Sequence, residues 1–193
     1  MEKTKTEVAK EIINMFLEGS QADYELLADI LIRKEYRKGQ RIIDEGTVCR
    51  DYIYVEQGLV RQFYYKNSHD ITEHFSAEGD LLMCIESLYQ EVPTHLMAEA
   101  LEPCVVYFFN YKKLVELTDE SKVLRTWLRL TLQEDLVVSQ QKADSWRFET
   151  AKEKYARFFK DYPEAAKRAS VNHIASYLLM TPETLSRIRG GAI

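Results

Sequence analysis

The sequence lacks the features that mark membrane-spanning and exported proteins. None of its apolar runs approaches the ~18 residues that a membrane-spanning helix needs. Residues 1–5 are rich in charge and are not followed by the apolar segment of a signal peptide. We therefore expect a cytoplasmic protein that makes no contact with a membrane.

Motifs for metal ligation and thiol chemistry are also missing. The three cysteines, Cys49, Cys84 and Cys104, are scattered, and no C-x-x-C pair or tight Cys/His cluster accompanies them. We expect buried free thiols, which suits a reducing compartment. We predict no enzyme activity, no catalytic residue, no cofactor and no bound metal.

Basic residues are distributed unevenly, although a net charge of −5 gives the chain an acidic balance. From Arg147 onward there are nine Lys or Arg and five Asp or Glu residues, so this part carries +4 and residues 1–146 carry −9. An acidic body joined to a basic terminal part indicates a small module that faces nucleic acid.

The pattern of residues 36–109 is typical of antiparallel β structure. Short runs rich in β-branched and aromatic residues are separated by glycine-containing turns, with no long helical pattern between them. These runs are 41–43, 52–55, 59–65 and 105–109. Strands at this spacing predict an antiparallel barrel or sandwich, and helical periodicity in residues 6–33 predicts two short helices before it, separated at Gly19 and Ser20.

A long helix without glycine or proline is predicted over residues 123–141, and a second helix over residues 151–162. Apolar positions on the long helix form two stripes, one near 123/127/130/137 and one near 124/128/132/136. A helix that is apolar on two sides has two partners, here the barrel and a second copy of the chain, unless it is buried inside a monomer. We predict a homodimer, with the interface at Val123, Trp127, Leu130 and Val137.

Residues 170–189 have the residue spacing of a helix-turn-helix. Ala175 is the small residue that lets the second helix cross the first closely, and apolar residues lock the two helices together. These apolar residues are Ile174, Leu178, Leu185 and Ile188. Thr181 is a good N-cap for the second helix, and Pro182 suits its first position. The turn departs from the usual pattern because Leu179 stands where glycine is common.

The order of these elements, together with several short motifs, resembles the Crp/Fnr superfamily of bacterial regulators over nearly the whole chain. The matching segments are 38–39, 45–46, 52–61, 78–80, 99–102, 174–177 and 181–189. The resemblance implies an α+β fold with an N-terminal antiparallel β-barrel (a double-stranded β-helix, or jelly roll) and flanking helices. Its implied parts are a cyclic-nucleotide-binding-like effector domain (1–118), a dimerisation helix (119–145) and a helix-turn-helix DNA-binding domain (146–193).

The same resemblance implies a sequence-specific transcriptional regulator that binds double-stranded DNA, a second copy of itself and RNA polymerase. Glu183 and Arg187 fall on base-reading positions of the recognition helix, and Thr184 is expected to point the same way. Phosphate contacts are expected from Lys167, Arg168 and Arg189. The β-wing that usually follows in the family would come after residues 190–193, where the sequence ends.

Members of this superfamily that bind cyclic AMP hold its phosphate with an arginine and its ribose with a glutamate. Here Cys84 takes the place of the glutamate, and the segment 83–97 has no Arg or Lys. A buried phosphate would lack a partner, so we do not expect cyclic AMP to bind. Iron–sulfur members need an N-terminal cysteine cluster, and no cysteine precedes Cys49. A pocket, if present, should suit an uncharged or apolar effector and be lined by Met83, Cys84, Thr94, His95, Ser139 and Gln140.

Two alternatives stay open at this point. The barrel could be structural, which would make the protein an effector-less regulator or an adaptor. A more remote alternative is a cupin-like metalloenzyme that uses His69, Glu73, His74 and His95, although the sequence has no His-x-His motif.

Overall fold

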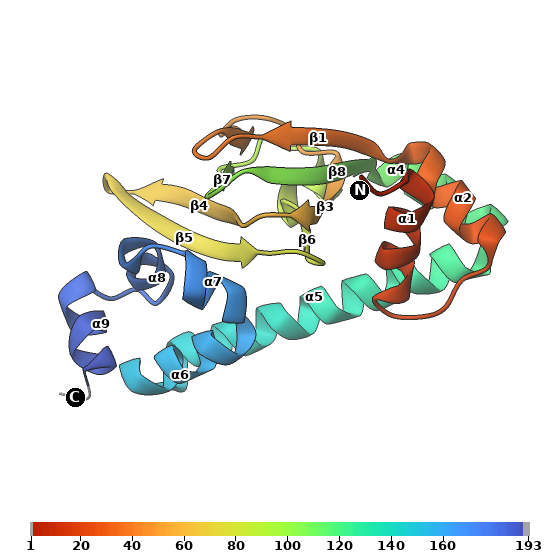
Figure 1. The fold of residues 1–193 in the computed structure, drawn as a ribbon. Coiled ribbons are helices and arrows are strands. Elements are labelled where there is room, and N and C mark those ends of the chain that lie inside the picture. Colours follow the sequence, from red (N-terminus) through yellow and green to blue (C-terminus); the bar gives the residue numbers. More distant parts are fainter. Residues whose placement is uncertain (1, 191–193) are drawn as a thin grey trace.

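A computed structural model describes residues 2–190, and two short capped helices open the chain (Figure 1). α1 (Lys5–Asn14) begins after Thr4 and α2 (Gln21–Ile30) after Ser20. Each N-cap hydroxyl accepts a hydrogen bond from the backbone N–H three residues later, and the carboxylate at that position bonds back to the cap. The predicted break at Gly19 and Ser20 is present, but residues 32 and 33 belong to the first strand.

Eight antiparallel strands form two four-stranded sheets. One sheet has the order β1-β8-β3-β6 and the other β2-β7-β4-β5, which is the predicted jelly-roll type of barrel. The strands are β1 (Ile32–Tyr36), β2 (Arg41–Ile43), β3 (Asp51–Gln57), β4 (Val60–Lys66), β5 (His69–Ser76), β6 (Leu81–Leu82), β7 (Met97–Ala100) and β8 (Cys104–Asn110). A short helix, α3 (Ile85–Gln90), lies between β6 and β7.

The strand β5 forms the edge of its sheet, and its sequence does not alternate between apolar and polar residues. Its Asp70 accepts two hydrogen bonds of 2.7 Å from the guanidinium of Arg61 on β4, whose side chain is buried. Glu99 on β7 accepts two more from the same guanidinium, at 3.0 and 2.7 Å. A buried cation is tolerated because both carboxylates neutralise it, and this pairing keeps charged residues inside the sheet.

Two helices connect the barrel to the C-terminal part. α4 (Tyr111–Glu120) begins after Asn110, and α5 (Lys122–Phe148) runs from the N-terminal helices along the barrel to the opposite end of the molecule (Figure 1). α5 starts three residues later and ends three residues later than the segment 119–145 expected from the sequence. Its first half packs on a core made by α1, α2 and the sheet that contains β3 and β8.

Four short helices complete the described chain: α6 (Ala151–Asp161), α7 (Pro163–Arg168), α8 (Val171–Tyr177) and α9 (Pro182–Arg189). Their apolar core is continuous with the barrel, because Phe75 of β5 packs between the rings of Phe158, Tyr162 and Tyr177. The centroid of the Phe75 ring lies 5.9 to 6.0 Å from the centroids of these three rings. The C-terminal helices are therefore held directly against β5 rather than only through the connecting helix. No helix within residues 2–190 is long and apolar enough to cross a membrane.

Candidate nucleic-acid interface and ligand cavity

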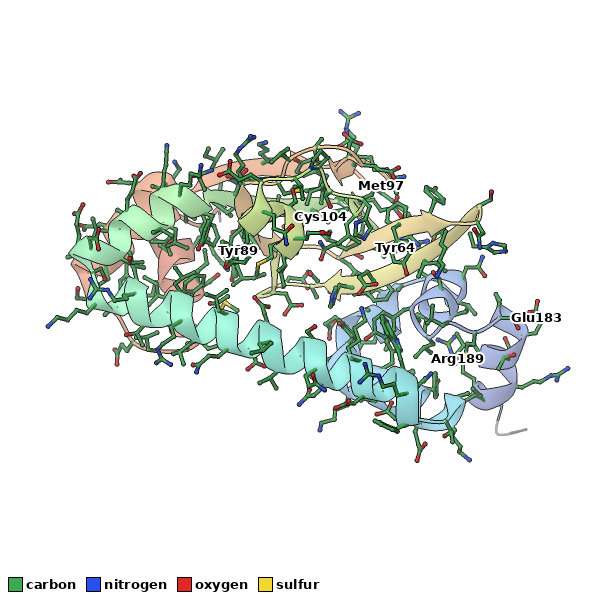
Figure 2. All side chains as sticks on the ribbon, turned by 180° about the vertical axis from the view of Figure 1, so that it is seen from behind. Tyr64, Tyr89, Met97, Cys104, Glu183 and Arg189 are labelled. Carbon is green, nitrogen blue, oxygen red and sulfur yellow. The ribbon has the colours of Figure 1, made fainter. Side chains whose placement is uncertain are left out.

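The helix α9 has one buried face and one exposed face. Leu185 and Ile188 are buried, Leu185 in one core cluster with residues of α8, whereas Glu183 and Arg187, one turn apart, are exposed. Figure 2 shows Glu183 at the end of the molecule farthest from the N-terminal helices. Hydrogen bonds from its own backbone N–H and from Thr181 lower the pKa of Glu183, so its carboxylate is charged at neutral pH. Thr184 is half-buried, and its backbone N–H donates to the hydroxyl of Thr181.

The turn between α8 and α9 keeps the usual helix-turn-helix conformation without glycine. Leu179 has a φ of +54°, and the next residue, Met180, donates its backbone N–H to the carbonyl of Ala175. A left-handed non-glycine residue costs roughly 1–2 kcal/mol. The buried contacts of Ala175 and Leu185 hold the turn in place, so the departure noted in the sequence changes its energy and not its geometry.

Polar contacts fix α8 on the edge of the barrel. The hydroxyl of Ser176 donates to the carbonyl of Asp70 at 2.7 Å and accepts from the backbone N–H of Thr72 at 2.8 Å. Because Arg61 holds the side chain of Asp70, the position of α8 is tied to the charged pair inside the barrel.

The three predicted phosphate contacts differ in their surroundings. Arg168 forms ion pairs with Glu78 and Glu102 of the barrel at 2.7 and 2.8 Å, so it holds the C-terminal helices to the barrel and is not presented to DNA in this arrangement. A phosphate contact by Arg168 would therefore have to replace these two ion pairs. Lys167 makes only an exposed pair with Glu164, which a phosphate can replace at little cost. Arg189 is exposed near the end of α9.

A partly open cavity of about 470 Å³ lies where the barrel, α5 and α6 meet. Its apolar wall comes from Phe75 and from residues 81–83 of the barrel, together with Val138 of α5. Its polar lining consists of Gln62, His74, Ser76, Asp80, Thr131, Glu134, Asp135, Gln141, Lys142, Arg157, Asp161, Tyr162 and Tyr177. The cavity therefore touches both the effector-type barrel and the C-terminal helices.

Most of the pocket residues predicted from the sequence lie elsewhere. Met83 lines the cavity, but Cys84 and Thr94 are buried inside the barrel and His95 is exposed against the ring of Tyr64. Ser139 and Gln140 are exposed on α5 and do not line the cavity. Val138 and Gln141 of α5 line this cavity, and the predicted residues 139 and 140 lie between them.

Two cations near the cavity already have partners. Lys142 donates to the carbonyl and to the carboxylate of Glu73, and Arg157 pairs with Glu149 at 3.2 Å. Burial, helped by the charge of Lys142, lowers the pKa of His74 to about 3, so its ring is neutral and its Nδ1 lies 3.2 Å from the hydroxyl of Tyr162.

Unlike these two cations, the carboxyl group of Asp135 has a buried oxygen without a partner. Burial raises the pKa of Asp135 to about 6, and its buried Oδ2 has no hydrogen-bond partner. The polar lining thus combines a carboxylate that lacks a donor with cations whose charge is already neutralised. Such a site disfavours an anion and accepts a ligand with a hydrogen-bond donor.

Asp135→Asn should raise the free energy of unfolding near pH 7.5 by about 1–2 kcal/mol and change it little near pH 4. In the folded protein the carboxyl group holds its proton up to about pH 6. In the unfolded chain its pKa has the ordinary value of 3.8, so the proton is lost at lower pH. The contribution of this group to the free energy of unfolding therefore falls as the pH rises from about 4 to 6. The expected change is smaller than the full pKa shift would give, because Asp135 is partly exposed to solvent. Urea denaturation at the two pH values measures this.

The neighbouring exposed residue Glu134 provides the control for this measurement. Glu134→Gln removes an exposed charge, and because the charge of Glu134 is the smaller cause of the raised pKa of Asp135, it should give only a small part of the gain at pH 7.5 and none at pH 4. An equal gain in both variants would show that general charge repulsion, and not the burial of Asp135, sets the effect.

The residues predicted to form the dimer interface are mostly not those that α5 exposes. Trp127 is fully buried, and its indole N–H donates to the carbonyl of Ile12 at 2.7 Å, so it cannot contact a second copy. Val123 packs on the same core and Leu130 is half-buried, while Val137 is exposed. A shallow apolar groove follows another row instead, formed by Leu128, Leu132 and Leu136 with Arg125, Arg129, Gln133 and Thr118 at its edges.

The structure also separates the histidines that the sequence offered as metal ligands. His69 is exposed at the β4–β5 turn, while His74 is half-buried beside Tyr162. Within residues 2–190, no three His, Cys, Asp or Glu side chains gather as a metal site would require.

Sequence reasoning missed Asp135 and Lys142, although a signal was present. Both are charged residues on the face of α5 that carries the buried residues Trp127, Thr131 and Ser145. A charged residue that falls, by helical spacing, on the buried face of a helix indicates a polar cavity or a buried ion pair.

Comparison with known proteins agrees with this architecture. Residues 33–121 match the family model described as the cyclic nucleotide-binding domain. FixK2 from Bradyrhizobium japonicum superposes with a TM-score of 0.69 at 22% identity, covering 84% of this chain and 84% of its own. The c-di-GMP-responsive global regulator CLP of Xanthomonas campestris gives a TM-score of 0.68 at 14% identity, covering 87% and 89%.

A third similar structure is the catabolite activator protein of Thermus thermophilus, with a TM-score of 0.58, 19% identity and coverage of 93% of this chain and 85% of its own. No curated protein sequence matches the chain significantly. At these identities the likeness is one of fold, and it extends from the barrel through the C-terminal helices.

Proposed function

The chain has the fold of the Crp/Fnr superfamily, as its motifs predicted, and we propose that it is a sequence-specific DNA-binding transcriptional regulator without enzyme activity. The observation that carries this proposal is the exposed face of α9, where Glu183 and Arg187 stand one turn apart on a capped helix. An arginine can donate to O6 and N7 of guanine, and a glutamate can accept from N4 of cytosine. RNA polymerase and double-stranded DNA are the partners that such a regulator requires.

We propose that the active form is a homodimer and that a second copy covers the groove of Leu128, Leu132 and Leu136. These residues recur at every fourth position and are flanked by Arg125 and Arg129, so two copies of α5 would bury their apolar row and leave the cations at its rim. A two-fold dimer places its recognition helices on DNA half-sites about 34 Å apart.

We further propose that the cavity between the barrel, α5 and α6 binds a neutral or cationic small molecule. The free Oδ2 of Asp135 needs a donor, whereas Lys142 and Arg157 are already paired. A cyclic nucleotide, or the anionic c-di-GMP named for the Xanthomonas relative, would meet more carboxylates than free cations there. This cavity favours an effector-dependent regulator over one whose barrel is only structural.

Arg187→Ala should lower the affinity for the preferred DNA site by about 1–3 kcal/mol and relax the preference at one base pair in each half-site, because two directed donors are lost. Selection of binding sites from random DNA, with wild type and variant, measures both effects. The selection is run with and without cell extract, so that a need for an effector is seen as a need for the extract.

Lys167→Ala is the matched control, because a phosphate contact carries no sequence information. It should weaken binding to all sequences alike and reduce the salt dependence. If the wild type selects no two-fold site even with extract at low salt, the helix-turn-helix has only a structural role and the proposed function is wrong.

A further inference from the structure

Arg168 lies directly before the helix-turn-helix. α7 ends at Arg168, and only Ala169 separates it from Ser170, the N-cap of α8. α8 is the first helix of the helix-turn-helix, and in DNA complexes of this motif the first helix crosses the sugar–phosphate backbone. An arginine just before α8 is therefore close enough to the expected path of a DNA strand to pair with a phosphate once its guanidinium is released.

In the free protein three carboxylates surround this guanidinium. Glu78 accepts two hydrogen bonds from it, at 3.0 and 2.7 Å, and Glu102 accepts one at 2.8 Å. The carboxylate of Glu164 lies 3.6 Å from the buried Nε of Arg168, which has no hydrogen-bond partner within residues 2–190. One cation thus faces three carboxylates, and this cluster repels a phosphate as long as Arg168 is held in it.

The C-terminal helices do not depend on these ion pairs for their position. The side chains of Glu78 and Glu102 are 40% and 32% exposed, and ion pairs at such exposure contribute little to stability. The helices are also held by Phe75, which packs in their core, and by the hydrogen bonds of Ser176 to β5. Arg168 can therefore leave its carboxylates while the helices remain docked on the barrel.

We propose that Glu78 and Glu102 compete with the DNA backbone for Arg168, so that the barrel weakens DNA binding until Arg168 exchanges these carboxylates for a phosphate. The inference rests on the proposed DNA-binding function and adds to it an inhibitory contact between the barrel and the helix-turn-helix. Because the guanidinium of Arg168 holds the pKa of Glu78 at about 2, the competing charge is present throughout the neutral pH range.

The test is the double variant Glu78→Gln/Glu102→Gln. Glutamine keeps a carbonyl oxygen, so position 78 can accept the backbone N–H of Gly58 as Glu78 does at 2.8 Å. The affinity for duplex DNA of random sequence should rise by up to about fivefold for each bound protomer at low salt, because Arg168 gains a phosphate. The plot of log affinity against log salt should steepen by about 0.9 for each bound protomer. Fluorescence anisotropy at several salt concentrations measures both.

The matched control carries the same two substitutions together with Arg168→Ala. This variant has lost the same negative charges but has no guanidinium to release, so it shows the effect of reduced charge repulsion alone. Its salt dependence should not steepen relative to that of Arg168→Ala. An equal change in affinity and slope with and without Arg168 would overturn the proposal.

Labelling with phenylglyoxal, which modifies accessible guanidinium groups, tests the contact without an affinity measurement. Peptide masses should show that Arg168 reacts severalfold faster in the double variant than in the wild type, and that DNA protects it there. The exposed Arg187 is the internal reference, which DNA should protect in both proteins.

The labelling also distinguishes the two ways in which the proposal can fail. If Arg168 reacts equally fast in both proteins, or if DNA protects Arg187 and not Arg168 in the double variant, this inference is wrong and the proposed function stands. If DNA protects neither arginine at low salt, the proposed function is wrong as well.

Discussion

Leu136→Glu is expected to convert the proposed homodimer into a monomer and to lower its affinity for a two-fold DNA site by about 10²–10⁴-fold, because the two recognition helices no longer bind together. Leu136 is 72% exposed and continues the row of Leu128 and Leu132. In the monomer the new carboxylate would meet only solvent, but at a two-fold contact it would be desolvated within an apolar row. Analytical ultracentrifugation measures the mass, and fluorescence anisotropy with a selected site measures the affinity.

Val137→Glu is the control for this experiment. It changes the adjacent residue, which is 49% exposed but points about 100° away around the helix. This variant should remain a dimer and bind DNA as the wild type does. A dimeric Leu136→Glu protein, or a monomeric Val137→Glu protein, would contradict the assignment of the interface to the row of Leu128, Leu132 and Leu136.

Trp127→Ala is expected to lower the free energy of unfolding by about 3–5 kcal/mol, because it leaves a large cavity in the core. The fully buried ring lies 6.1 to 6.4 Å, between centroids, from Phe16, Tyr52 and Phe109, and so joins α1, the barrel and α5. The variant also leaves the carbonyl of Ile12 without its donor, which adds to the loss. Urea denaturation at one fixed protein concentration measures the change.

Phe148→Ala provides the matched comparison on the same helix. Phe148 is 78% exposed, so its removal should change stability by less than about 1 kcal/mol. Similar losses in the two variants would show that burial of Trp127 is not the source of the effect. A Trp127→Ala protein of unchanged stability that dissociates into monomers would restore this residue to the dimer interface.

The barrel was predictable where strands alternate and turns contain glycine. Residues 41–43, 52–55 and 105–109 fall on strands of the structure, and so do residues 60–65 of the run 59–65. The strand β5 escaped prediction because Asp70 and Glu73 stand where apolar residues are usual. Their partners, Arg61 and Lys142, come from another strand and from α5, and no local pattern records such pairings.

The helix-turn-helix was predictable almost residue by residue. Its signals are local: the cap at Thr181, proline at position 182, and the inward residues Leu185 and Ile188 all act within one or two helical turns. The role of Arg168 was not predictable, because its partners Glu78 and Glu102 lie in the barrel. Arg168, which was expected to face DNA, links the C-terminal helices to the barrel through these ion pairs.

By itself the sequence determined the order of the elements, the jelly-roll type of the barrel and the spacing of the helix-turn-helix, because each depends on periodicity and capping over a few residues. Only the tertiary structure decided which side of α5 is buried. A row of residues spaced by four drifts about 40° around a helix at each step, so Leu124 is inside and Leu136 outside although they share one stripe. The cavity beside Asp135 was likewise decided by long-range packing, which brings together residues that no local pattern connects.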